Sequence, residues 1–85
     1  MSTRFKRDLK RVSKRGSNID ILEKVVNLLQ NEKTLPHKYQ DHGLSGKWNG
    51  YRDCHVTPDW ILIYKATDDG SLELARTGSH ADFNV

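Results

Sequence analysis

The spacing of the apolar residues changes once along this chain, and that change restricts the fold more than any other feature of the sequence. Before residue 31, apolar residues recur every three or four positions, which is the spacing of a helix with one buried face. From Tyr51 onward they alternate with polar residues or form short runs, as they do in β-strands. The sequence therefore predicts helices followed by an antiparallel sheet, which is an α+β fold.

Two helices are predicted in the first third of the chain. The first begins at Thr3 or Ser2, either of which can cap it, and ends at Gly16. Its narrow apolar seam consists of Phe5, Leu9 and Val12. Asn18 can cap a second helix over residues 19–31, whose apolar face is wider. That face consists of Ile21, Leu22, Val25, Val26, Leu28 and Leu29.

Three strands are predicted in the second half, at residues 51–56, 60–66 and 71–77, joined by short turns. The helices are expected to pack on one face of a sheet of three or four strands. Between the two halves, Pro36 precedes the polar segment 37–50, whose length makes it a candidate functional loop. We expect residues 1–85 to form one domain, since 85 residues support a single core.

The composition indicates the cellular compartment in which this protein is expected. Cys54 is the only cysteine, so disulfides cannot stabilise this small core, and we expect a reduced protein of the cytoplasm. The longest apolar run, residues 60–64, is far shorter than the roughly 20 residues that cross a membrane. Nothing near Met1 resembles a signal peptide. No membrane partner is expected.

The charges are separated along the chain. Residues 1–47 hold 11 basic and 5 acidic residues, a net +6, whereas residues 48–85 hold 3 and 6, a net −3. Seven of the basic residues lie in the first predicted helix, namely Arg4, Lys6, Arg7, Lys10, Arg11, Lys14 and Arg15. Such a face can bind the phosphates of a nucleic acid, although a solvated helix face has the same composition.

Histidine is unusually frequent. His42, His55 and His80 lie where predicted strands meet loops, and His37 lies in the polar loop. Imidazole exchanges protons near neutral pH, and RNA can be cleaved through its own 2′-hydroxyl by one base and one acid. The connectivity allows these histidines to converge with Asp59 over one face of the sheet.

Other chemistries fit less well. Zinc uses histidine and cysteine, but Cys54 and His55 are adjacent and would point to opposite faces of a strand. No pair has C-x-x-C or H-x-x-x-H spacing. The serines lack a nucleophile-elbow context, and there is no phosphate-binding G-x-x-x-x-G-K-[ST] loop. The sequence therefore predicts no metal site and no cofactor.

Three separated motifs resemble the YafQ branch of the RelE/ParE toxin superfamily. They are L-P-H-K-Y-Q-D-H-G-L-S-G at residues 35–46, G-Y-R-D-C-H-V-T-P-D-W-I-L-I-Y-K at residues 50–65, and R-T-G-S-H at residues 76–80. The text F-K-R-D-L-K at residues 5–10 also fits the family. The resemblance covers nearly the whole chain and keeps the order of the motifs.

This resemblance implies a toxin of a bacterial toxin–antitoxin system that enters the ribosomal A site and cleaves mRNA there. It implies a small α+β fold like that of microbial ribonucleases. The expected partners are a cognate antitoxin protein, the ribosome with its rRNA, and mRNA. The basic residues of the first helix are then expected to bind RNA in the ribosome.

The resemblance also assigns residues. The catalytic set falls on His42, His55, Asp59 and His80. We expect His80 to be the general acid, Asp59 or His42 the base, and His55 a group that orients or stabilises the phosphate. Three further residues are expected to contact the substrate: Arg52, Trp60 and Phe83. Trp60 also opens an apolar strand and by default would belong to the core.

Two departures from the family pattern stand out. Phe83 lies one residue earlier than the aromatic that usually follows the last histidine, so it can either stack on the substrate or pack against the sheet. Family members usually begin with a strand, whereas this chain starts almost at the first helix. The uncovered sheet edge is expected to lower stability and to favour edge association.

Two other functions remain open from the sequence. A ParE-like toxin would inhibit DNA gyrase by binding alone, and a basic module would bind RNA or DNA through the first helix. Neither has a reason to retain the set of three histidines and Asp59, which is what distinguishes the nuclease.

Overall fold

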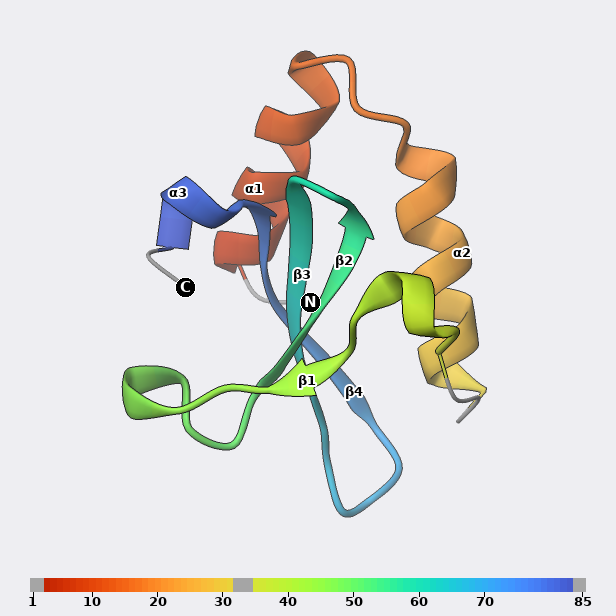
Figure 1. The fold of residues 1–85 in the computed structure, drawn as a ribbon, viewed down its shortest axis with the longest axis vertical. Helices are drawn as coiled ribbons and strands as arrows, with labels where there is room; N and C mark the ends of the chain where they lie inside the picture. Colours follow the sequence, from red (N-terminus) through yellow and green to blue (C-terminus); the bar gives the residue numbers. More distant parts are fainter. Residues whose placement is uncertain (1–2, 32–34, 84–85) are drawn as a thin grey trace.

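The computed structural model describes residues 3–31 and 35–83, and its helices and strands follow the predicted order (Figure 1). The elements are α1 (Thr3–Lys14), α2 (Ile19–Gln30), the 3-10 turn η1 (His37–Tyr39), β1 (His42–Gly43), the 3-10 turn η2 (Gly46–Trp48), β2 (Arg52–Thr57), β3 (Trp60–Ala66), β4 (Leu72–Ser79) and α3 (His80–Phe83). Ser2, the alternative cap of the first helix, lies outside the described residues. Asn18 caps α2 as predicted, because its Oδ1 accepts a hydrogen bond from the Asp20 N–H at 3.0 Å.

The sheet has four antiparallel strands in the order β1-β2-β3-β4. The three predicted strands and the α+β class are confirmed. The fourth strand, β1, comes from the segment that was expected to be irregular, and it pairs His42 with Asp53 and Gly43 with Arg52. Within the described residues β4 is an outer strand, so the expected edge association stays a prediction.

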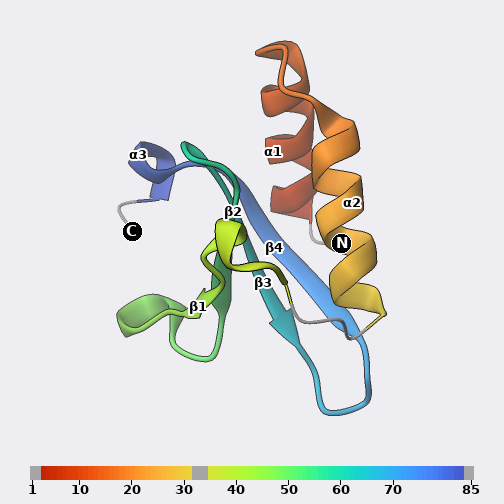
Figure 2. The same cartoon turned by 45° about the vertical axis from the view of Figure 1, so that its right-hand side comes forward.

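Two apolar clusters occupy the two faces of the sheet. Figure 2 shows α1 and α2 on one side, and β1, η2 and α3 on the other. The larger cluster, on the helix side, includes Phe5, Val25, Leu62 and Tyr64. The smaller one consists of Ile61, Ile63, Ala75 and Phe83, with residues of η2 and its neighbours against it. Because β3 is buried on both faces, its residues from Trp60 to Tyr64 form a continuous apolar run.

A buried carboxylate fastens α1 to β4. Asp8 is 2% exposed and receives both forks of the Arg76 guanidinium, Nε at 2.6 Å and Nη2 at 3.0 Å. It also accepts hydrogen bonds from the Thr77 N–H at 3.2 Å and from Arg11 at 3.1 Å. A buried charge is costly unless it is paired and hydrogen-bonded, and all of these donors serve one carboxylate.

In the part of the chain that the structure describes, every helix is too short or too polar to cross a bilayer.

Replacing Asp8 tests this attachment. Asp8→Asn leaves the buried Arg76 fork without its anion, so the free energy of unfolding is expected to fall by about 3 kcal/mol, the low end for a broken buried pair because Arg76 is partly exposed. Urea denaturation measures the change. Glu23→Gln, at an exposed position of α2, is the matched control and should move the midpoint little. Equal midpoints for the two variants would contradict the assignment.

Candidate active site

Three histidines gather around one buried carboxylate on the sheet face opposite α1 and α2. The rings of His55 and His80 meet edge to face, with centroids 4.8 Å apart. His42 Nδ1 lies 3.1 Å from Oδ1 of Asp53, which is 2% exposed. The charges of all three histidines act on the Asp53 carboxyl. The convergence predicted for the histidines is thus present, with Asp53 at its centre.

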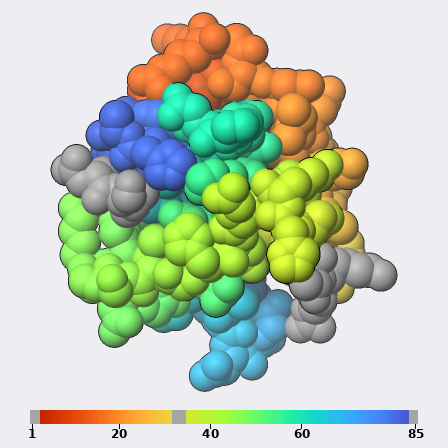
Figure 3. All heavy atoms as spheres, in the orientation of Figure 1, coloured from red at the N-terminus to blue at the C-terminus, as the bar shows by residue number. Residues whose placement is uncertain are grey.

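Figure 3 shows the elements on this side of the molecule, where the segment 37–50, the turn at residues 57–59 and α3 lie next to one another. The His42 side chain is 53% exposed, while His55 and His80 are half-buried. The imidazoles are therefore accessible to a large substrate.

The loop before β1 orients His42. Its Nδ1 lies 2.8 Å from the Gln40 carbonyl oxygen, and since a carbonyl can only accept, the hydrogen belongs on Nδ1. The Nε2 lone pair of the neutral ring is then available to a substrate. Gln40 presents this carbonyl from a left-handed conformation with φ of 47°, which for a non-glycine residue costs about 1 kcal/mol.

Asp41 fastens the same loop to the sheet. It accepts hydrogen bonds from the Tyr64 hydroxyl at 2.5 Å and from Arg52 Nε at 3.1 Å. Burial first, and then Asp41, raise the pKa of Tyr64, so the hydroxyl remains a donor. Arg52 pairs with Tyr64 across β2 and β3, on the helix side of the sheet. Arg52 therefore helps to attach this loop to the helix side of the sheet, and it is not one of the groups beside the histidines.

The two residues predicted from the P-D-W motif lie at the turn from β2 to β3, where they line a small hollow together with Ser79, the residue before His80. Asp59 is exposed in the turn, and within the described residues it makes no hydrogen bond or ion pair with His42, His55 or His80. Trp60 is 7% exposed, and its Nε1 donates to Thr77 Oγ1 at 2.7 Å. Trp60 thus belongs to the core, which was the default expectation.

A short helix carries His80. Asp82 Oδ2 accepts the Ser79 N–H at 2.9 Å, which is half of a capping box. Arg11 and Arg15 of α1 lie 3.7 and 3.5 Å from the same oxygen. Two residues of the basic face therefore hold α3 in place.

Phe83 and Gly78 determine how closely α3 packs against the sheet. Phe83 is 5% exposed, packs on the sheet and lies under the Arg76 guanidinium, whose Cζ is 4.9 Å from the ring centroid. Of the two expectations for Phe83, the structure shows packing against the sheet. A Cβ at Gly78 would come within 2.6 Å of Asp82 Oδ2 and 3.1 Å of Phe83 Cζ. The glycine of the T-G-x-H motif thus allows α3 to lie close to β4.

Burial decides the pKa of two groups near the site. It raises the pKa of Asp53 above its usual value, against the opposing effect of the three histidines. It also raises the pKa of the Cys54 thiol to about 12, so this fully buried group is neither a ready nucleophile nor a ready metal ligand. Among residues 3–31 and 35–83, no three histidine, cysteine or acidic side chains are arranged to hold a metal ion.

Sequence reasoning missed the parts played by Asp53, Gln40 and Asp82. Strand alternation does place Asp53 on the same face as His55, and S-x-x-D at residues 79–82 is the signature of a capping box. The carbonyl of Gln40 has no such signal, because its role depends on a left-handed backbone.

Comparison with known proteins shows the family to which the chain belongs. A family described as the bacterial toxin of type II toxin–antitoxin system, YafQ, matches residues 1–84. The chain belongs to this YafQ family. It is 48% identical over 81 residues to the mRNA interferase toxin YafQ of Escherichia coli, covering 94% of this chain and 87% of that protein.

Solved structures of bacterial toxins have the same fold. A crystal structure of YafQ from E. coli matches with a TM-score of 0.91 at 46% identity, covering 95% of this chain and 90% of that one. The E. coli DinJ–YafQ complex matches with a TM-score of 0.88 at 47% identity, covering 96% and 91%. A metal-bound toxin from Helicobacter pylori matches with a TM-score of 0.90 at 40% identity, covering 96% and 92%.

The attachment of α3 can be tested through pH. The Ser79 N–H, then Arg11 and Arg15, lower the pKa of Asp82, so its contribution to stability is full above the usual carboxyl pKa of about 3.9 and is lost as the pH falls through the lowered value. Asp82→Asn should therefore reduce the free energy of unfolding by about 0.5 kcal/mol at pH 7 and leave it unchanged in strong acid. Urea denaturation at both pH values measures this.

Asp68→Asn is the control, since Asp68 is an exposed loop carboxylate. A loss that persists in acid, or an equal loss in the control, would show that the Asp82 charge does not hold α3.

Proposed function

We propose that this toxin is an mRNA interferase that cleaves mRNA in the ribosomal A site and so inhibits translation. The observation that supports it most is the meeting of His42, His55 and His80 on one accessible face. Several histidines around a carboxylate supply a base, an acid and a group for the phosphate, which are the requirements of cleavage through the 2′-hydroxyl.

His42 is the base and His80 the acid in this mechanism. His42 Nε2 takes the proton of the 2′-hydroxyl as the 2′-oxygen bonds to phosphorus. The bond from phosphorus to the 5′-oxygen breaks, and protonated His80 gives its proton to that oxygen. The products are a 2′,3′-cyclic phosphate and a 5′-hydroxyl. We choose His42 over Asp59 as the base because the Gln40 carbonyl fixes the hydrogen on Nδ1 and leaves Nε2 to accept a proton.

His55 and Asp53 support these transfers. His55 lies against His80, and in this proposal it orients the phosphate between the acid and the base. The Asp53 carboxylate lies beside three imidazoles, so it stabilises the protonated His80 before the reaction and the imidazolium that forms on His42 as that ring takes the proton. No resident metal ion takes part in this scheme, which distinguishes it from metal-assisted hydrolysis.

The basic face of α1 binds ribosomal RNA in this proposal. Within the described residues, five of its cations have no ion-pair partner: Arg4, Lys6, Arg7, Lys10 and Lys14. These are the cations that can neutralise phosphates. Arg11 and Arg15 share their charge with Asp8 and Asp82.

A cognate antitoxin protein is the expected regulator, as in the E. coli DinJ–YafQ complex. The cytoplasm is the expected compartment, since the proposed substrate is mRNA on the ribosome.

Removing His80 tests the mechanism. In a cell-free translation reaction, His80→Ala should slow cleavage of the translated message by at least about 100-fold, which is the usual loss when a general acid is removed. His42→Ala should lose a similar amount. His37→Ala is the matched control, because His37 lies in η1 and is not one of the three clustered histidines. Primer extension on the message reads the cuts.

Full activity of His80→Ala would reject the mechanism, and inhibition of DNA gyrase without cleavage would favour the ParE-like alternative. Phenanthroline, which removes transition metals but leaves the magnesium of the ribosome, should not change the rate. Loss of cleavage on its addition would show that a metal ion takes part.

A pair of double variants separates the two kinds of basic residue on α1. Arg7→Gln with Lys10→Gln should reduce cleavage about tenfold at unchanged cut sites and flatten its salt dependence, without a change in stability. Arg11→Gln with Arg15→Gln removes the same charge but should also lower the free energy of unfolding by about 1 kcal/mol, because α3 loses its partners. Indistinguishable unfolding curves for the two double variants would contradict this division.

A further inference from the structure

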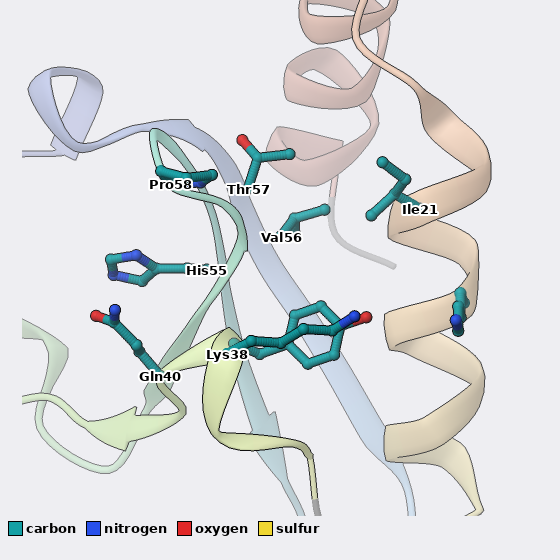
Figure 4. Close-up of a pocket in the computed structure, with 9 residues that line it drawn as sticks. Ile21, Lys38, Gln40, His55, Val56, Thr57 and Pro58 are labelled. Carbon is teal, nitrogen blue, oxygen red and sulfur yellow. The ribbon is translucent and has the colours of Figure 1, made fainter.

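A groove runs from the histidine cluster to α2. It lies between α2, η1 and the end of β2, has a volume of about 530 Å³ and is lined in part by His55 (Figure 4). This is within the range of about 300–1,000 Å³ that ligand sites usually have. The groove is separate from the basic face of α1, which has its own shallow hollow.

The end of β2 is open along the groove. The short strand β1 pairs only with Arg52 and Asp53, so within the described residues no strand covers the outer edge of residues 54–57. In Figure 4 His55 and Val56 point to opposite sides of β2, with Val56 toward α2 and His55 away from it, where His55 meets the His80 ring. A chain molecule that contacts His55 can therefore continue past the edge of β2 into the groove.

The groove combines an apolar floor with a cationic rim. Ile21, Val56 and the buried ring of Tyr39 form the floor, and Lys24 and Lys38 are exposed at the rim. Among the described residues that line the groove, none is a carboxylate.

Lys38 is held in a position that suits this rim. Its Nζ lies 5.1 Å from the centroid of the Tyr39 ring, a cation–π distance, and its side chain extends across that ring toward α2. The two ammonium groups thus come from opposite sides of the groove, one from η1 and one from α2.

We propose that this groove binds the nucleotide next to the scissile phosphate, with its flanking phosphates on Lys24 and Lys38 and its base over Ile21 and Val56. The assignment rests on the proposed ribonuclease function and adds the path of the RNA strand to it. The cations of the rim match a polyanion, and the apolar floor matches the face of any base. Continuity with His55 connects this path to the site of cleavage.

Salt dependence gives a sharp test. The probe is a fluorescent RNA oligonucleotide with one 2′-deoxy sugar at the site to be cut, so that it binds without being cleaved. Affinity is measured on the purified protein over a series of KCl concentrations. Each phosphate contact on a single strand contributes about 0.7 to the slope of log affinity against log salt. Lys24→Gln with Lys38→Gln should therefore weaken binding about tenfold and reduce the slope by about 1.4.

Lys47→Gln is the matched control for each single change, since Lys47 is exposed in η2 and does not line the groove. It should leave the slope unchanged, while Lys24→Gln and Lys38→Gln should each lower it by about 0.7. Methyl resonances of Ile21 and Val56 should shift when the RNA is added to the wild type.

Three results would overturn the proposal: no measurable binding of this RNA, the same slope for the groove variants and the control, or shifts confined to α1.

The proposed function is tested separately, by cleavage of a translated message. Wild type that cleaves while the groove variants bind normally would remove the groove assignment alone. RNA bound in the groove of a protein that cleaves nothing would retain the groove and remove the ribonuclease. A peptide that shifts Ile21 and Val56 when the RNA does not would assign the groove to a protein partner.

Discussion

The paired carboxylate of Asp8 organises more of this small protein than any apolar contact does. It joins the first helix to the last strand, and through Arg76 it reaches the ring of Phe83. That strand ends at Ser79, and the next residue is His80. The position of the proposed acid therefore depends in part on a charge contributed near the beginning of the chain, which adds a long-range contact to those that Asp82 and Phe83 make within and beside α3.

The two faces of the sheet have different roles, and the apolar strand β3 contributes to the cluster on each of them. One face buries the helices and most of the core, while the other carries a small cluster under α3 and η2. Beside that small cluster lie the histidines and Asp53. If β1 slipped by one residue against β2, the side chain of His42 would move to the other face of the sheet. The pairing of His42 with Asp53 therefore helps to position His42, together with the loop before it.

The periodic parts of the chain were predictable, and the exceptions have physical reasons. The two long helices and three strands follow from apolar spacing, whereas β1 is two residues long and lies among polar and glycine residues that have no period. The clustering of the histidines was foreseen. The burial of the Asp53 side chain was not foreseen, because it depends on which strands pair with β2. Arg11 and Arg15 look like their basic neighbours in sequence, and only the folded position of Asp82 separates them.

The left-handed backbone at Gln40 has a consequence for how the site meets its substrate. The conformational cost at Gln40 is met when the protein folds, so His42 needs no rearrangement when RNA arrives. Such a site is set before its substrate binds and does not depend on closing around it. In the proposed mechanism, a partner that covers this face is therefore sufficient to silence the toxin, because no change of shape is needed to activate it.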